Sequence, residues 1–288
     1  MEKRSFAGTL HALRSGVLMI VALVAGACSL SVANETDTDL ANVARKTLPA
    51  GAGDHRISYL ESGDPRGRLV VFVHGTPGDA RGWHFYLAHV PVGFHYIALD
   101  RPGFGQSDTD SAVPSLAEQA GAVARVVEAQ GSGPAILVGH SLGGPIVART
   151  AVDSPKLVAA LVILAGAFDP SLEHVQFLQK IGDTWPVSAV LPRRVRNANR
   201  ELIPLKGQLS QLEPLLRSIA VPVFVVHGTK DNLVPFANVA FLRSHLTGAR
   251  KFVATAIAGQ DHMLPWNAKP QVLTAIALAA AEAQAHAP

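Results

Sequence analysis

Four unbroken apolar runs constrain the fold of this chain more than any other feature of its sequence. They read LVVFV, ALVIL, AILV and VFVV, and they occupy residues 69–73, 160–164, 135–138 and 223–226. A strand with one buried face alternates apolar and polar side chains, whereas a strand of a parallel sheet covered on both faces loses this alternation. The runs therefore predict a parallel sheet in the interior of the molecule.

Segments with helical character separate these runs along the chain. We expect helices at about residues 114–130, 142–153, 235–246 and 269–286, and two further strands at 56–62 and 95–100. Alternation of strands and helices is typical of an α/β fold with a doubly wound, mostly parallel sheet and right-handed crossovers. Ligands of such sheets bind at the carboxyl ends of the strands, so the residues that follow each strand are the candidates for a site.

One segment, at about residues 169–215, is longer than an ordinary crossover between strands. A structureless loop of this length is uncommon inside a compact domain, so we expect a small lid of two or three short helices. The length of 288 residues does not require a second domain. We therefore predict one α/β domain over residues 55–288, with the lid inserted into it.

The first 33 residues resemble an export signal. Lys3, Arg4 and Arg14 precede the uncharged run GVLMIVALVAGA, which is short for a transmembrane span. Three outcomes are open: lipidation at Cys28 in the lipobox-like VAGAC, cleavage after Ala33, and an uncleaved anchor. Each places the domain outside the cytoplasm, in the bacterial envelope, the periplasm or the medium. Residues 34–54 are polar and turn-rich, and they are expected to form a tether.

The composition argues against a disulfide within the domain and against a nucleic-acid partner. Cys28 is the single cysteine, so no disulfide can form within the domain. The formal net charge is +3, and the basic cluster RRVRNANR at residues 193–200 lacks interleaved aromatic side chains. We interpret the cluster as a solvated helix face and expect no nucleic-acid partner. The oligomeric state stays open.

Gly139, Ser141 and Gly143 form a G-x-S-x-G pattern between a predicted strand and a predicted helix. A serine in such a turn has a strained backbone, so the residues two before and two after it must be small. Pro145 falls in the first turn of the helix, where a missing N–H group costs little. The free amides at the helix start direct positive partial charge toward the serine. The pattern predicts that Ser141 is a nucleophile.

A serine nucleophile needs a general base and an acid that orients the base. Among the 12 histidines the candidate base is His262, in a loop that follows the run KFVATAI and reaches the same sheet edge as Ser141. Asp231 follows a predicted strand at that edge and is the favoured acid. Asp169 also follows a strand and stays open as the alternative.

The developing charge on an attacked carbonyl needs two hydrogen-bond donors, which together form an oxyanion hole. One expected donor is the backbone N–H of Leu142, the residue after the nucleophile. The other is the backbone N–H of Thr76, in the turn HGTPGD after the run LVVFV. Trp185 in the lid and Met263 and Trp266 beside His262 are candidate substrate-binding residues.

Five blocks, HGTPG, DRPGFGQSD, GHSLGG, HGTKDNLVP and GQDH, together resemble the α/β-hydrolase superfamily across the chain after residue 55. The resemblance implies a lid after the sixth strand and a Ser–His–Asp triad that uses neither a metal nor an organic cofactor. Ser141 stands where epoxide hydrolases and haloalkane dehalogenases carry an aspartate nucleophile, which argues against those relatives.

These observations favour an exported serine hydrolase of the carboxylesterase or lipase kind that acts on a small-molecule ester or similar acyl substrate. A carbon–carbon bond hydrolase or a perhydrolase with the same triad is the first alternative. A non-catalytic envelope binding protein of the same fold is the second. The sequence does not identify the acyl group.

Overall fold

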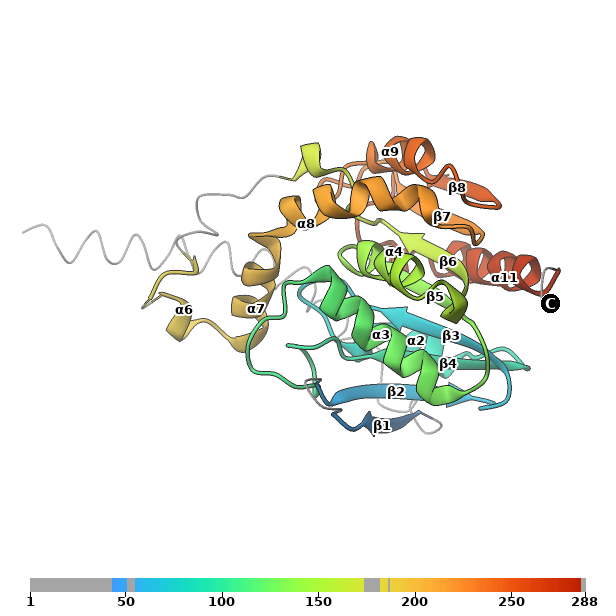
Figure 1. Cartoon of the computed structure of the whole chain (residues 1–288), viewed down its shortest axis with the longest axis horizontal. Helices are drawn as coiled ribbons and strands as arrows, with labels where there is room; N and C mark the ends of the chain where they lie inside the picture. Colours follow the sequence, from blue (N-terminus) through green and yellow to red (C-terminus); the bar gives the residue numbers. More distant parts are fainter. Residues whose placement is uncertain (1–42, 51–54, 174–181, 186, 286–288) are drawn as a thin grey trace, which may run out of the picture. The chain divides into compact units, whose positions relative to one another are not determined.

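The computed structural model describes residues 43–50, 55–173, 182–185 and 187–285. All of them belong to one compact unit, Thr38–Pro288, whose centre is an eight-stranded sheet flanked by helices (Figure 1). The strands are β1 (Ala44–Leu48), β2 (Ile57–Gly63), β3 (Arg68–Val73), β4 (Phe94–Leu99), β5 (Ala135–His140), β6 (Val158–Leu164), β7 (Val223–Gly228) and β8 (Phe252–Ile257). Their order in the sheet is β1-β2-β4-β3-β5-β6-β7-β8.

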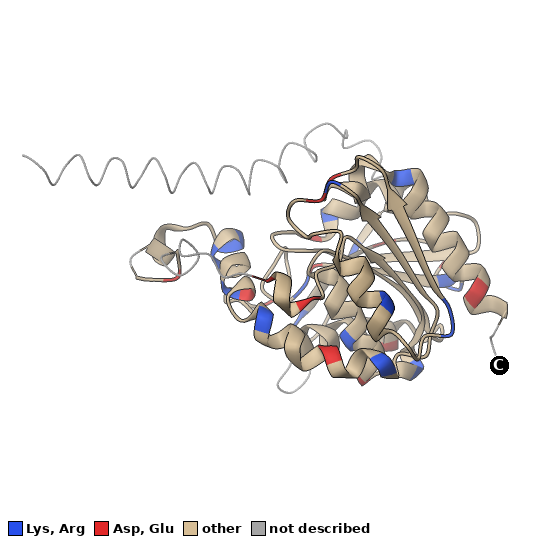
Figure 2. Cartoon of the chain, turned by 90° about the horizontal axis from the view of Figure 1, so that it is seen from above, with Lys and Arg blue, Asp and Glu red and all other residues tan. Residues whose placement is uncertain are grey.

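The sheet is mostly parallel. The pairs β3–β4, β3–β5, β5–β6, β6–β7 and β7–β8 are parallel, and only β1–β2 and β2–β4 are antiparallel. Strands β4 to β8 contain no lysine, arginine, aspartate or glutamate, and Figure 2 shows many of the charged residues on helices and loops. All six residues of β5 are buried. The predicted α/β fold class is confirmed.

Helices cover both faces of the sheet and lie between the strands along the chain. The α-helices are α2 (His84–Ala88), α3 (Leu116–Gln130), α4 (Gly143–Asp153), α6 (Val187–Val190), α7 (Arg193–Leu202), α8 (Leu205–Leu212), α9 (Asn238–His245), α10 (Leu264–Asn267) and α11 (Lys269–Ala285). Short 3₁₀ helices are η2 (Ala80–Trp83), η3 (Pro155–Leu157), η4 (Pro170–Leu172) and η5 (Glu213–Ser218).

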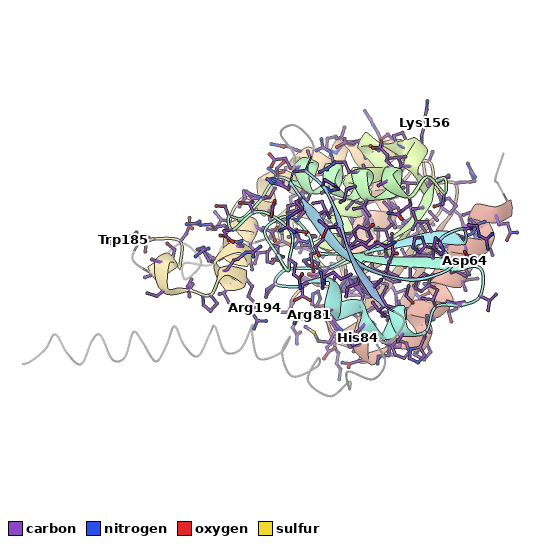
Figure 3. All side chains as sticks on the ribbon, turned by 90° about the horizontal axis from the view of Figure 1, so that it is seen from below. Asp64, Arg81, His84, Lys156, Trp185 and Arg194 are labelled. Carbon is purple, nitrogen blue, oxygen red and sulfur yellow. The ribbon has the colours of Figure 1, made fainter. Side chains whose placement is uncertain are left out.

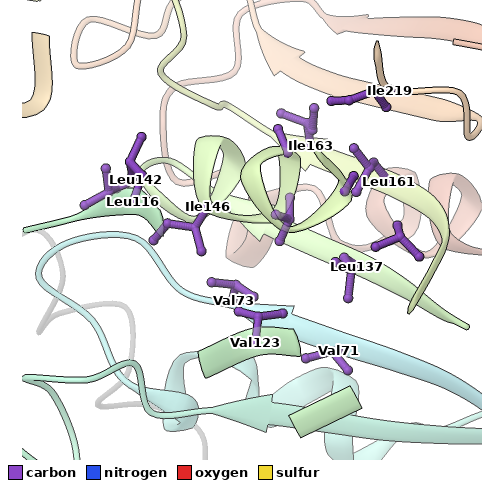
Figure 4. Packing of buried hydrophobic residues seen from close by; sticks show 14 of the residues in the cluster. Val71, Val73, Leu116, Val123, Leu137, Leu142, Ile146, Leu161, Ile163 and Ile219 are labelled. Carbon is purple, nitrogen blue, oxygen red and sulfur yellow. The ribbon is translucent and has the colours of Figure 1, made fainter. Parts of the chain in front are cut away.

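Alternate side chains of each strand feed two separate apolar cores. Val71 and Val73 of β3 pack with residues of α3, α4, α8 and α9, whereas Val70 and Phe72 pack on the opposite face with residues of α2 and α11. Figure 4 shows the first core, where Ile146 of α4 lies among strand and helix side chains. Because both faces are buried, the strands tolerate no polar alternation, which is why the apolar runs marked them.

The termini of α3 and α4 differ in a way that bears on the site. The hydroxyl of Ser115 accepts a hydrogen bond from the backbone N–H of Glu118 at the start of α3, and Gly131 ends that helix in a left-handed conformation with φ 62°. Helix α4 has no side-chain cap at its start. Its first turn therefore leaves backbone donors free beside Ser141.

The structure corrects the prediction for residues 34–54. Residues 44–48, expected to be part of a tether, form the edge strand β1, which pairs along its whole length with β2. The export signal at residues 1–33, including Cys28, lies outside the described residues. In the part of the chain that the structure describes, every helix is too short or too polar to cross a bilayer.

The long segment between β6 and β7 contains the helices α6, α7 and α8 and the short helices η4 and η5. We call residues 169–215 the inserted segment. Its helical content agrees with the sequence prediction, and residues 174–181 and 186 within it lie outside the described part. That it acts as a lid stays a prediction.

Candidate active site

Ser141 lies at the tight turn between β5 and α4, with a left-handed backbone conformation of φ 54°. A Cβ atom on Gly139 would collide with the carbonyl oxygen of Gly143, and a Cβ atom on Gly143 would collide with that of Val73. Both positions therefore exclude any side chain. The strain at Ser141 lifts its hydroxyl above the carboxyl edge of the sheet, as expected for a nucleophile elbow.

His262 and Asp231 meet at the same edge of the sheet. The Nδ1–H group of His262 donates a hydrogen bond of 2.7 Å to Oδ2 of Asp231. The other carboxylate oxygen, Oδ1, accepts from the backbone N–H groups of Leu233 and Val234 at 2.9 and 2.8 Å. With its Nδ1 atom protonated, the neutral imidazole carries a lone pair on Nε2, which can accept a proton.

Asp231 stays ionised although it is buried. Burial would raise the pKa of this carboxyl, but hydrogen bonds from His227 and His262 and from the N–H of Val234 hold the pKa well below its usual range. The Nε2 atom of His227 lies 3.5 Å from Oδ2 of Asp231 and 2.9 Å from the carbonyl oxygen of Val234. The site thus places a fixed negative charge behind His262.

Asp169, the alternative acid, has a different role in the structure. Its Oδ1 atom accepts a 2.8 Å hydrogen bond from the N–H of Ser171 and caps the short helix η4. Its own N–H donates to the side chain of Asn238 at 2.9 Å. The structure brings Asp231, and not Asp169, against His262.

The turn after β3 approaches Ser141 closely. A Cβ atom on Gly75 would lie 2.7 Å from Cβ of Ser141 and 3.3 Å from its Oγ. The backbone N–H groups of Thr76 and Leu142 donate no hydrogen bond within the described part of the chain, and neither does the hydroxyl of Ser141. Two free donors beside a free hydroxyl are what an oxyanion hole needs before substrate arrives.

Comparison with known proteins gives the family. The model of the alpha/beta hydrolase fold family matches residues 68–189. An esterase of Rhodococcus sp. ECU1013 superposes with a TM-score of 0.61 and 21% identity, over 83% of this chain and 99% of the esterase. Residues 68–189 therefore belong to the alpha/beta hydrolase fold family, and the described chain as a whole has the α/β-hydrolase fold.

Two curated relatives illustrate how the similarity is distributed. A non-heme chloroperoxidase of Streptomyces lividans is 29% identical over 231 residues, which cover 64% of this hydrolase and 82% of the relative. The dihydrolipoyllysine-residue acetyltransferase component of the acetoin cleaving system of Cupriavidus necator is 38% identical over 110 residues, which cover 38% of this chain. That match spans only 29% of the acetyltransferase component's length.

His140 is a site residue of this hydrolase whose role the sequence did not indicate. Its ring lies 4.8 Å from that of His262, centroid to centroid, and its Nε2–H group donates a 3.1 Å hydrogen bond to the backbone carbonyl of His262. Burial, followed by the neighbouring His262, lowers the pKa of His140 to about 3. His140 is therefore a neutral brace for the loop that carries His262.

The predicted substrate-binding residues have different surroundings. Trp185 is 83% exposed on the inserted segment, and Figure 3 shows it away from the body of the sheet. Its role in substrate binding stays a prediction. The indole N–H of Trp266 donates to the carbonyl of Gly82 at 2.9 Å, and its ring packs edge-on against His140. Trp266 thus contacts His140 and the Gly82 backbone, and it packs beside the site. Met263 is half-buried directly after His262.

Among the described residues, no group of three or more histidine, cysteine, aspartate or glutamate side chains is arranged to hold a metal ion. The groups that the described part of the site offers are a hydroxyl, an imidazole, a carboxylate and backbone amides.

Proposed function

We propose that this α/β hydrolase is a serine hydrolase that cleaves an ester or similar acyl substrate through Ser141, His262 and Asp231. The observation that carries the proposal is the 2.7 Å hydrogen bond from His262 to Asp231, at the same sheet edge as a serine with a left-handed backbone. That bond fixes the tautomer in which Nε2 of His262 is free to take a proton.

The reaction proceeds through an acyl-enzyme. Nε2 of His262 accepts the proton of the Ser141 hydroxyl as Oγ attacks the substrate carbonyl, and the carbonyl oxygen becomes an oxyanion held by the N–H groups of Leu142 and Thr76. His262 then gives its proton to the leaving alcohol as the bond to it breaks. A water molecule, deprotonated by His262, releases the acid and restores Ser141.

Asp231 stabilises the imidazolium that forms in each step. Because the pKa of Asp231 is held low, its carboxylate stays charged while His262 gains a proton, and no proton has to pass to the carboxylate. Two further histidines support this pair. His140 bonds to the backbone carbonyl of His262, and His227 lies beside the carboxylate of Asp231.

A covalent label tests the nucleophile. A fluorophosphonate probe is expected to add one phosphonyl group to the peptide that contains Ser141, and Ser141→Ala is expected to abolish both the label and the turnover of short aryl esters. A folded wild-type protein that takes no label, or equal turnover by the Ser141→Ala variant, would overturn the proposal and favour a non-catalytic binding protein.

The acid is tested by two matched substitutions. Asp231→Asn leaves the size of the side chain unchanged but favours the wrong tautomer of His262, so kcat is expected to fall by about 10⁴-fold. Asp169→Asn changes a helix cap far along the chain from His262 and is expected to leave kcat within about two-fold. A collapse of kcat in Asp169→Asn alone would reverse the assignment.

Perhydrolysis is a second candidate activity, and the similarity to a non-heme chloroperoxidase over 231 residues favours it. In this reaction hydrogen peroxide replaces water, attacks the acyl-enzyme and leaves as a peracid while Ser141 recovers its proton. Peroxide-dependent halogenation of a dimedone in acetate buffer, lost in Ser141→Ala, measures it. No observation here favours carbon–carbon bond hydrolysis.

We also propose that the hydrolase is exported, with Cys28 as the lipidated residue. The run GVLMIVALVAGA before Cys28 supports this. Incorporation of labelled palmitate in a bacterial host, lost in Cys28→Ser, is the expected result. A soluble processed form whose new N-terminus is Asn34 would show cleavage by ordinary signal peptidase instead.

A further inference from the structure

Arg101 is a fully buried arginine that the proposed reaction does not use. It follows β4 and is 0% exposed. Its Nε–H group donates to the carbonyl oxygen of His74 at 3.0 Å, and its Nη2–H group donates to that of Gly75 at 3.1 Å. The guanidinium thus donates hydrogen bonds to two consecutive carbonyls of the turn that approaches Ser141.

The hydrogen bond from Arg101 to the carbonyl of Gly75 fixes the direction of the Thr76 N–H group. The carbonyl of Gly75 and the N–H of Thr76 belong to one peptide group, and this peptide bond is trans. In a planar trans peptide the C=O and N–H bonds point in opposite directions. When hydrogen bonds hold the carbonyl oxygen on one side, the N–H of Thr76 must point to the other side, away from Arg101.

His74 holds the same carbonyl from a second direction. The backbone N–H of Arg101 donates to Nε2 of His74 at 3.1 Å, so the ring hydrogen lies on Nδ1 and is donated to the carbonyl of Gly75 at 2.7 Å. Burial, and then the charge of Arg101, lower the pKa of His74 to about 3, so this single neutral tautomer persists at neutral pH. Two donors on one oxygen also polarise the peptide group and strengthen its N–H as a donor.

Glu201 of helix α7 holds Arg101 in this position. Its two carboxylate oxygens accept from Nη1 and Nη2 of Arg101 at 2.7 and 3.0 Å, in a bidentate pair. Glu201 is itself buried, and it also accepts from the side chain of Gln119 in α3 at 3.2 Å. Glu201 belongs to the inserted segment, so this segment is linked through one ion pair to the turn that contains Thr76.

We propose that Arg101 and Glu201 are positioning residues for the oxyanion hole, which aim the Thr76 N–H and couple the inserted segment to the chemical step. The proposal rests on the proposed serine hydrolase activity. Neither side chain touches substrate in it. Their contribution is a fixed peptide orientation, which stabilises the tetrahedral oxyanion more than the bound ester.

Two conservative substitutions test this. Arg101→Lys keeps the charge but has three donors on a single nitrogen, so it cannot make all four hydrogen bonds of the guanidinium. Glu201→Gln keeps the shape but loses the bidentate ion pair. Removal of one oxyanion donor typically lowers kcat by 10²–10³-fold, so misdirection of one is expected to lower kcat by about 10- to 100-fold. KM for a short aryl ester is expected to stay within about two-fold.

A transition-state analogue separates positioning from general stability. A trifluoromethyl ketone forms a tetrahedral adduct with a nucleophilic serine, and its affinity is expected to fall in both variants by the same factor as kcat. Rates are normalised to the fraction of protein that is folded, measured by circular dichroism. Arg125→Lys is the matched control, because Arg125 also donates to two backbone carbonyls, those of His55 and Pro49, and is expected to leave kcat and the ketone affinity unchanged.

The outcomes are distinct. If the wild type turns over aryl esters, Ser141→Ala does not, and both variants keep kcat and ketone affinity per folded molecule, the positioning role is wrong while the proposed function stands. The same holds if kcat falls but ketone affinity does not. If Arg101→Lys fails to fold, the near-isosteric Glu201→Gln still decides the question. A wild type without Ser141-dependent turnover contradicts the proposed function itself.

Discussion

Gly75 lies so close to the nucleophile that no side chain fits at its position. In Gly75→Ala the new Cβ atom would lie 2.7 Å from Cβ of Ser141, so either the serine or the turn after β3 must shift. A misplacement of about 1 Å can cost 10²-fold in rate, and we expect a fall in kcat of at least that order. Steady-state hydrolysis of an aryl ester measures it. Unchanged kcat would mean that the turn can retreat without harm.

Gly121 provides the matched glycine. It lies inside α3, and a Cβ atom there would meet nothing within 4 Å. Gly121→Ala is expected to raise the free energy of unfolding by about 0.5–1 kcal/mol, because glycine is a poor helix former, and to leave kcat unchanged. Urea denaturation checks the first statement, and a loss of stability would contradict it.

Single residues at strand ends were the part of the site that the sequence could predict. Ser141, Asp231 and His262 each follow a strand of one parallel sheet, and the carboxyl ends of such strands share an edge. Arg101 and Glu201 could not be paired in this way, because 100 residues separate them and no local pattern links them. Buried ion pairs of this kind depend on how the inserted segment packs.

At the scale of elements, β1 illustrates what a pattern search misses. Its sequence ARKTL is short and polar, and its side chains are half-buried or exposed, as is usual for an edge strand. What holds it is partly a single contact: Nη1 of Arg45 donates at 2.6 Å to the buried carboxylate of Asp100. That carboxylate also accepts from the backbone N–H groups of Ala80 and Gln106.

Removal of Arg45 is expected to destabilise the protein. Arg45→Met leaves the charge of Asp100 buried without its cation, and loss of one partner of a buried pair costs about 3 kcal/mol or more. Because 25% of the Arg45 side chain is exposed, solvent screening reduces this cost. We expect the free energy of unfolding, measured by urea denaturation, to fall by about 2 kcal/mol.

Arg66→Met is the control for Arg45→Met. The side chain of Arg66 is 92% exposed, and it lies 3.6 Å from Asp64. A change within about 0.5 kcal/mol is expected. Equal effects of the two substitutions would show that the Arg45–Asp100 contact does not hold β1.

Helix α7 is only partly the solvated helix that its charged residues predict. The sequence predicts a solvated face for the cluster RRVRNANR, and its arginines are exposed or half-buried. Arg193 also donates to the backbone carbonyls of Ser107 and Thr109. Asn197 and Glu201 continue this face at intervals of four residues and are buried. A polar helix face can be buried when most of its polar groups find hydrogen-bond partners, and the sequence of the helix alone does not contain those partners.

For the whole molecule, buried neutral histidines predict sensitivity to acid. The pKa of His140 and that of His74 are lowered from 6.5 to about 3 in the folded state. Between these values the unfolded chain binds one more proton at each position, so stability present above pH 6.5 is lost as the pH falls toward 3. Each histidine contributes a slope of about 1.4 kcal/mol per pH unit.

Substitution of one histidine should flatten this slope. His140→Gln keeps an N–H donor for the carbonyl of His262 but cannot titrate, so the fall in unfolding free energy between pH 6 and 4 is expected to be shallower by up to about 1.4 kcal/mol per pH unit. Urea denaturation at several pH values measures it. Parallel profiles for wild type and His140→Gln would contradict the burial argument.

The order of the strands along the chain has a consequence for when the enzyme becomes reactive. β5, which carries Ser141, lies in the middle of the chain, whereas Asp231 follows β7 and His262 follows β8. During synthesis the serine emerges well before its proposed base and acid. In the proposed mechanism a partly made chain therefore holds a serine with ordinary alcohol reactivity, and turnover begins only when the last two strands have joined the sheet.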